Sequence, residues 1–326
     1  MGSKHYGRRV YSFLLCFLAV FGLGASGADA QPYPAKTIEW ISHSSAGSGT
    51  DLFNRNVSGM LEKEKIFNVP FIHTNRVGGN GLIAYQYLKN KKGDPHVVMA
   101  MSVTVILTQS ILPDTGLALD SLTPIIRFAQ DPQVVAVRTE SKFKTYKELI
   151  AAARDGNVVA GITGPTGSGR AALYYIERDT GAKFKYVTFK GGGDAVLATL
   201  GGHVEVTTEN MSEMLPLVEA GKMRILAVTG ERRFKQVPDV PTLKELGYAR
   251  VIATGRGFGM PPGVPRDAAA TMEKALKHVY DSQAYRDYAD RNMFEDAYLN
   301  SAEFAKALVA QRAEQLEFLK AIAIVK

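Results

Sequence analysis

Short apolar stretches alternate along this chain with longer stretches in which apolar side chains recur at helical spacing. The first pattern is typical of buried strands and the second of amphipathic helices. Strands are predicted over residues 37–42, 69–74, 97–101, 157–163, 186–189, 204–208 and 224–229. Helices are predicted over residues 51–65, 145–154, 170–180, 194–200, 211–220, 266–281, 284–292 and 301–320, with one more that ends at Asn90. This alternation predicts an α/β fold with largely parallel sheets.

The strand–helix pattern starts again after Lys144. Before that point, two apolar stretches flank Asp131-Pro132, where we expect the chain to cross over. Neither a long internal repeat nor a low-complexity linker separates the two halves. The sequence therefore predicts two α/β lobes joined by extended strands.

The first thirty residues have the composition of an export signal. Basic residues (Lys4, Arg8, Arg9) precede an apolar run over 10–23, and small residues close the segment at Ala30. This order is typical of a secretory signal peptide. The apolar run is too short for a membrane-spanning helix, which needs about 20 residues. We therefore expect cleavage near Ala30 and a function outside the cytoplasm, by Sec or twin-arginine export.

Composition removes several classes of function. The single cysteine lies in the leader, so the mature chain can form neither a disulfide nor a cysteine-based zinc site. The six histidines are scattered, with no pair at metal-ligand spacing, so we expect no metal and no cofactor. The net charge of +7 includes no basic run of the nucleic-acid-binding kind. The mild positive balance favours anionic ligands.

Four loops share one design, in which a strand ends, small residues follow and a helix begins. They span residues 42–51, 75–81, 163–169 and 190–194. The first N–H groups of a helix lack partners, and the helix dipole favours negative charge there. Glycine allows close approach of a ligand, and Ser and Thr add hydroxyl donors. Because all four loops follow predicted strands, they predict an anion-binding cleft, although each alone could be a tight turn.

Neither of two enzyme motifs is complete in this chain. Residues 164–171 approach a nucleotide-binding P-loop, but Arg170 and Ala171 replace the lysine and the magnesium-binding hydroxyl. ATP hydrolysis is therefore not expected. Arg170 is a candidate for bidentate carboxylate binding, or it points to solvent. Neither Ser48 nor Ser168 stands in the G-x-S-x-G motif of serine hydrolases.

An ordered set of motifs along nearly the whole mature chain resembles the periplasmic solute receptors of tripartite tricarboxylate transporters, the Bug family. The motifs lie at residues 33–38, 49–51, 75–81, 189–192, 200–204, 220–229, 237–243 and 261–265. The resemblance implies a two-lobed, Venus-flytrap binding-protein fold. Lobe one would hold residues 31–130 plus 236–326, and lobe two residues 131–235.

The implied function is non-enzymatic. A monomeric periplasmic receptor would capture a small organic acid and deliver it to the membrane subunits of a transporter. Two alternatives stay open: a ligand sensor that reports to a signalling receptor, and an exported hydrolase.

By position, the resemblance implies a set of ligand-binding residues in which Asp51 orders its loop. They are Ser45, Ala46, Gly47, Gly49, Thr50, Asp51, Ser102, Thr163, Thr166, Ser168, Arg170, Lys190, Gly191 and Asp194. The chain departs from the family in a more polar first loop, in Arg170 where many relatives have His, and in Arg256 where relatives often have Trp. These changes suggest an acid with more than one anionic or hydroxyl group.

Overall fold

The computed structural model describes residues 32–102, 122–189, 191–248 and 251–323, so the predicted leader lies outside the described residues. The strands are β1 (Ile38–Ser42), β2 (Phe71–Asn75), β3 (Val97–Met101), β4 (Thr123–Arg138), β5 (Val158–Thr163), β6 (Phe184–Phe189), β7 (Val206–Asn210), β8 (Met223–Val228), β9 (Ala253–Met260) and β10 (Glu295–Leu299). The helices are α1 (Gly49–Lys63), α2 (Leu82–Asn90), α4 (Tyr146–Arg154), α5 (Ser168–Thr180), α6 (Gly192–Leu200), α7 (Met211–Glu219), α8 (Arg266–Asp281), α9 (Gln283–Arg291) and α10 (Ser301–Ala321), with a 3₁₀ turn η1 (Gly79–Gly81).

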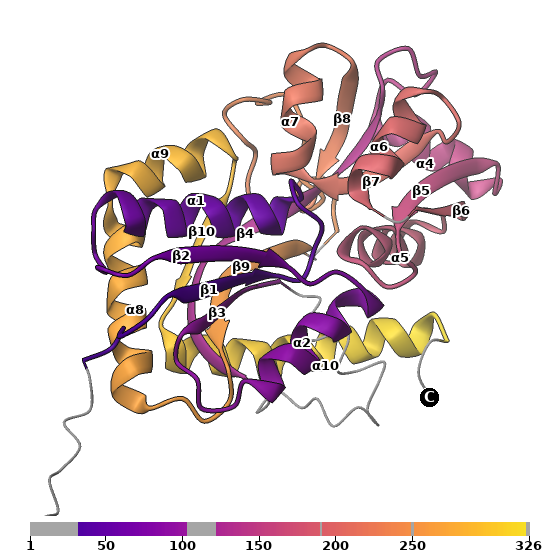
Figure 1. Ribbon diagram of the computed structural model, residues 1–326. Helices are drawn as coiled ribbons and strands as arrows, with labels where there is room; N and C mark the ends of the chain where they lie inside the picture. Colours follow the sequence, from indigo (N-terminus) through magenta and orange to yellow (C-terminus); the bar gives the residue numbers. More distant parts are fainter. Residues whose placement is uncertain (1–31, 103–121, 190, 249–250, 324–326) are drawn as a thin grey trace, which may run out of the picture. The chain divides into compact units, whose positions relative to one another are not determined.

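The strands hydrogen-bond in the order β2-β1-β3-β9-β4-β7-β5-β6, with β8 and β10 also paired to β4 (Figure 1). Strand β1 is parallel to β2 and β3, and β5 is parallel to β6 and β7. All pairs made by β4, and the pair between β3 and β9, are antiparallel. The α/β fold is confirmed, but the expectation of largely parallel sheets is wrong for the centre. The sequence pattern concealed β9 and β10, and these two strands supply much of the antiparallel pairing.

The expected crossover at Asp131-Pro132 is one long strand, β4. Its first half pairs with β9 and β10, and its second half pairs with β7 and β8. Register shifts interrupt its ladders with β9 and β8, as β-bulges do when they bend a strand. The strand therefore belongs to both groups of strands and places Asp131 where they meet.

Side chains alternate across the first group of strands. Ile38 and Trp40 of β1 join a buried cluster with apolar residues of α1 and α8, whereas Ile41 joins a second cluster with residues of α2 and α10. This period of two is what a strand buried on both faces requires. Figure 1 shows α1 and α10 on opposite faces of these strands.

The second group of strands follows the same rule. Val135 and Val137 of β4 pack with residues of α4 and α5. Val134 and Ala136 face the opposite way and pack with residues of α6 and α7.

Among the helices of the described ranges, none is long and apolar enough to cross a membrane.

Helix α10 packs against the first group of strands and against α5. Phe304 and Leu308 lie in the cluster with β3, and Phe318 and Leu319 lie against Ala171 and Tyr175 of α5. Both Phe318 and Leu319 have no exposed surface. The last turns of the helix therefore contribute an apolar contact to α5, whose N-terminus is one of the predicted ligand-binding loops.

We expect Phe318→Ala to lower the free energy of unfolding by about 3–5 kcal/mol, because it opens a cavity at a fully buried position. Val309→Ala in the same helix is the control, since Val309 is 62% exposed. It should change the free energy by no more than about 0.5 kcal/mol. Urea denaturation measures both, and equal effects would contradict the packing described for α10.

Candidate functional site

The first predicted loop joins β1 to α1 and is held by Asp51. The Asp51 carboxylate accepts hydrogen bonds from the Gly47 N–H (2.9 Å), Arg55 Nε (2.9 Å) and Asn75 Nδ2 (2.8 Å). Burial alone would raise the pKa of Asp51, but these hydrogen bonds, Arg55's first, lower it below its ordinary value. Asn75 belongs to the second predicted loop, so Asp51 ties the first two loops together.

Arg256 of β9 is the centre of the site. Its side chain is 2% exposed and donates from Nη1 to Thr50 Oγ1 (3.0 Å) and from Nη2 to Asp131 Oδ2 (2.5 Å). Asp131 has no exposed surface and also accepts from Ser212 Oγ (2.6 Å). The guanidinium therefore joins α1, β4 and β9 through a buried ion pair.

Gly49, the first residue of α1, allows this close approach. A Cβ atom at this position would lie 2.8 Å from Arg256 Nη2 and 2.6 Å from Glu213 Oε1. Both distances are shorter than real Cβ contacts, so a side chain at Gly49 would displace the charged groups. The small residue predicted here is thus needed for packing against charged neighbours.

Two glutamates lie at the end of β7 and the start of α7. Glu209 is 7% exposed and accepts a hydrogen bond from Thr163 Oγ1 (2.7 Å). Glu213 is half-buried and receives the Gly49 N–H. Burial, and then the charge of Glu213, raises the pKa of Glu209 to about 8. Burial also raises the pKa of Glu213, although the charge of Arg256 opposes this effect.

His43 and Ser102 follow β1 and β3 and contact each other. His43 Nε2 lies 2.9 Å from Ser102 Oγ, and both residues are buried. Burial, and then the charge of Arg256, lowers the pKa of His43 to about 4. The imidazole is therefore neutral at physiological pH and gives the site an uncharged polar group near Arg256.

The remaining predicted residues lie at the same strand ends with different exposure. Ser45, Ala46 and Gly47 are exposed, Thr166 is buried, and Asp194 is exposed in the first turn of α6. Ser168 begins α5 and its Oγ lies 3.3 Å from Thr254 Oγ1, and Gly191 precedes α6 as its N-cap. Lys190 lies outside the described residues.

Arg170 contacts Tyr186 of β6 and Glu177 of its own helix, α5. Its guanidinium carbon lies 4.2 Å from the centre of the Tyr186 ring, and Nη1 lies 3.5 Å from Glu177 Oε2. Arg256, which sequence reasoning noted only as a departure from the family, is the cation that reaches Thr50.

Sequence reasoning missed Asp131, Glu209 and Glu213. A usable signal existed, because Thr207-Thr208-Glu209-Asn210 is a polar run at the end of a buried strand. Asn210 precedes α7, so this run has the same strand–helix design as the predicted loops without their glycines.

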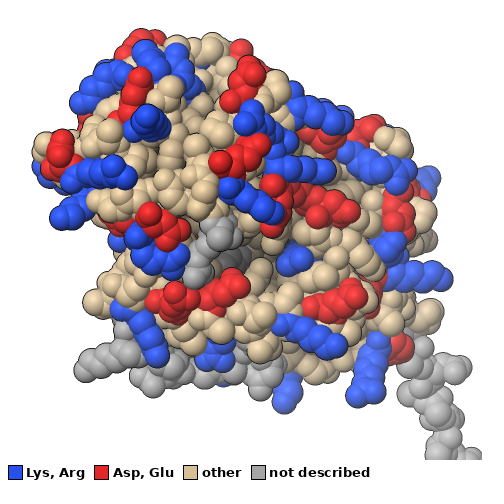
Figure 2. Space-filling model, turned by 180° about the vertical axis from the view of Figure 1, so that it is seen from behind, with Lys and Arg blue, Asp and Glu red and all other residues tan. Residues whose placement is uncertain are grey.

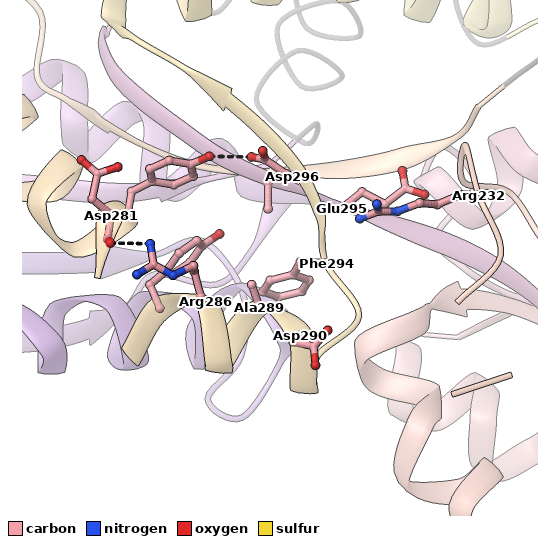
Figure 3. Close-up of a pocket in the computed structure, with 11 residues that line it drawn as sticks. Arg232, Asp281, Arg286, Ala289, Asp290, Phe294, Glu295 and Asp296 are labelled. Carbon is pink, nitrogen blue, oxygen red and sulfur yellow. Dashed lines mark hydrogen bonds between the residues drawn. The ribbon is translucent and has the colours of Figure 1, made fainter. Parts of the chain in front are cut away.

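A separate cavity of about 310 Å³ lies between α8, α9 and β10 (Figure 3). Four carboxylates line it, and two arginines, Arg232 and Arg286, oppose them. Tyr280 donates to Asp296 (2.7 Å), and Arg286 donates to the Asp281 carbonyl (2.6 Å). The hydrogen bonds of Tyr280 and Arg286 to neighbouring residues leave these donors less available to an anion.

Charged side chains of both signs are mixed on one face of the protein. Figure 2 shows basic and acidic side chains interspersed over that face. Within the described ranges, no group of three or more His, Cys, Asp or Glu residues could hold a metal ion.

Comparison with known proteins decides the family. The sequence profile of the tripartite tricarboxylate transporter family receptor matches residues 55–324. The chain belongs to this family. A UPF0065 protein from the gbd 5′ region of Cupriavidus necator is 28% identical over 292 residues, 88% of each chain. Protein BugT of Bordetella pertussis is 28% identical over 251 residues, 76% of each chain. The resemblance to the Bug family is thereby confirmed.

Solved structures agree with this assignment. A TctC solute-binding protein from Polaromonas matches the receptor with 29% identity and a TM-score of 0.69, over 89% of this chain and 99% of that one. Two Rhodopseudomonas palustris proteins share the fold: MatC with bound malate (19% identity, TM-score 0.77, covering 87% and 99%) and Rpa4515 with adipate (20%, 0.79, covering 89% and 98%).

We expect Arg256→Leu to destabilise the receptor by about 3–5 kcal/mol, because it leaves the carboxylate of Asp131 buried without its cation. Arg233→Leu is the control, since Arg233 pairs with Glu245 at the surface and exposed pairs contribute about 0–1 kcal/mol. Chemical denaturation measures both variants. A loss no larger than that of the control would contradict the role assigned to the buried pair.

The raised pKa of Glu209 predicts a pH dependence. Between the ordinary pKa of 4.5 and about 8, the folded protein retains a proton that the unfolded chain has released. Folded stability from this group is therefore complete below pH 4.5 and is lost as the pH rises through about 8. We expect Glu209→Gln to abolish this part of the decline in denaturation curves measured from pH 5 to 9. An unchanged pH profile in the variant would contradict the assignment.

Proposed function

We propose that this protein is a monomeric periplasmic receptor that binds a small organic carboxylate and delivers it to the membrane subunits of a tripartite transporter. The ligand lies where β1, β5, β6 and β7 end and α1, α5, α6 and α7 begin. Family membership supports the transport role. Malate and adipate in two proteins of the same fold support the carboxylate class.

The observation that carries the proposal is how these helices begin. The side chains at the N-cap positions Ser48, Gly167, Gly191 and Asn210 make no hydrogen bond to the following helix. At α1 and α7 a distant carboxylate accepts one first-turn N–H: Glu213 accepts from Gly49, and Asp131 accepts from Ser212. Thr145, Ser282 and Asn300 cap α4, α9 and α10 with side-chain hydrogen bonds, whereas Gly81 and Pro265 leave α2 and α8 without such a cap. Uncapped first-turn N–H groups are donors for an anion, and the helix dipole adds to the attraction.

The pair of His43 and Ser102 raises a hydrolase as the second candidate, because a serine hydroxyl next to an imidazole can act as a nucleophile. A general base must accept a proton, and the low pKa of His43, caused by burial and by Arg256, opposes this. We therefore favour binding over catalysis. Uptake measurements with the membrane subunits present would separate a transport receptor from a sensor.

We expect malate or adipate, added to refolded and ligand-stripped protein, to raise the thermal midpoint. A ligand at about 100 times its dissociation constant stabilises by roughly 2.7 kcal/mol, a shift of several degrees at this chain length. Neutral diols of the same length should give no shift. Stabilisation by the diols and not by the acids would contradict the carboxylate class.

We expect Ser168→Ala to weaken binding of the stabilising acid by about tenfold, since a hydrogen bond to a charged group contributes about 1.5–3 kcal/mol. Ser301→Ala is the matched control, because Ser301 is likewise the half-buried first residue of a helix, α10. Titration calorimetry measures both. Equal affinities of the two variants would remove Ser168 from the site.

A further inference from the structure

The carboxylates of Glu209 and Glu213 converge on Gly192, the first residue of α6. A Cβ atom at Gly192 would lie 2.7 Å from Glu209 Oε2 and 3.0 Å from Glu213 Oε2. Two acidic oxygens from β7 and α7 thus reach the same point at an uncapped helix start. Like charges in this arrangement repel each other unless a proton or a cation lies between them.

Among the described residues, no lysine or arginine forms an ion pair with either glutamate. Arg256 is close to Glu213, but its guanidinium hydrogen-bonds to Asp131 and Thr50. The hydroxyl of Thr163 is a neutral donor to Glu209. The site as described therefore sets three carboxylates against one guanidinium.

An independent observation concerns Arg256 itself. Its Nε, in a side chain that is 2% exposed, has no hydrogen-bond partner among the residues that the structure describes. An unpartnered buried donor costs about 1–3 kcal/mol unless a ligand or water satisfies it. The same small region thus contains a donor without an acceptor and acidic groups without a cation.

We propose that the ligand is a zwitterion, with a protonated amino group held by Glu209 and Glu213 beside Gly192 and a carboxylate held by the helix starts. This inference rests on the proposed function and narrows its ligand class to amino acids and their analogues. An ammonium group offers three N–H donors, which suit two carboxylates and a threonine hydroxyl.

The titration of the pair agrees with this geometry. In the free protein, burial and Glu213 hold a proton on Glu209 near neutral pH. The groups that face the pair are Thr163 of β5, Gly192 of α6, Gly49 of α1, Arg256 of β9 and the carboxylate of Asp131 of β4. A bound ammonium takes the place of the proton, so binding releases a proton to the buffer.

The test compares acids with their amino counterparts by calorimetry at pH 7: succinate with aspartate, adipate with 2-aminoadipate, and propionate with β-alanine, with propylamine as the amine that lacks a carboxylate. We expect the amino acid of at least one pair to bind about tenfold or more tightly, the gain from charge-assisted hydrogen bonds. Titration in two buffers of different ionisation enthalpy should show proton release.

Glu209→Gln and Glu213→Gln should each bring the ratio of the amino acid's affinity to the plain acid's affinity near one. Glu205→Gln should keep it, because Glu205 precedes the same strand at its other end and pairs with Lys142. The wild-type ratio tests the inference even if a variant folds poorly, and thermal unfolding of each variant checks its fold.

The outcomes separate the two claims. If a plain acid binds as tightly as its amino counterpart in every pair, the zwitterion inference is overturned and the carboxylate receptor stands. If propylamine binds as tightly as β-alanine, or if no probe binds, both are overturned. If the protein still binds the amino acid more tightly than the plain acid after each Glu→Gln substitution, the inference is also overturned.

Discussion

The buried ion pair between Arg256 and Asp131 is the constraint on which the rest of the site depends. It lies where β4 passes from one group of strands to the other, and its guanidinium also reaches Thr50 at the start of α1. A buried pair of this kind is costly to break and not necessarily stabilising overall. The pair acts here by positioning: Arg256 holds the start of α1 against β4, the strand that belongs to both groups of strands.

The charges around this pair decide what the site can bind. Burial and the charge of Arg256 keep His43 neutral, and burial keeps a proton on Glu209. One region therefore contains the neutral His43, the starts of helices α5 and α6, and the acidic pair of Glu209 and Glu213. In the ligand site that we propose, the acidic pair adds a place for positive charge beside the donors for a carboxylate. Helix α10 supports it from outside by packing Phe318 against α5.

Much of the fold could be predicted from periodicity. Helix α8 has the expected bounds because its buried residues recur at helical spacing, and strand β3 has them because it is a short run that is apolar and buried throughout. Strand β9 could not be predicted, since glycines at 255, 257 and 259 replace the side chains that mark a strand; a Cβ at Gly257 would lie 2.6 Å from a carbonyl of β4. Loop glycines pointed to Gly49 and Ser168. Arg256, Asp131 and the two glutamates come together only through antiparallel pairing, which no local pattern reveals. The division into two lobes stays a prediction.

The most direct test is a crystal structure of the mature receptor with the acid that raises its thermal midpoint most. We expect a carboxylate oxygen within hydrogen-bond distance of first-turn N–H groups of α1 or α5. An acid bound instead in the cavity between α8, α9 and β10, with the strand ends occupied by water alone, would contradict it.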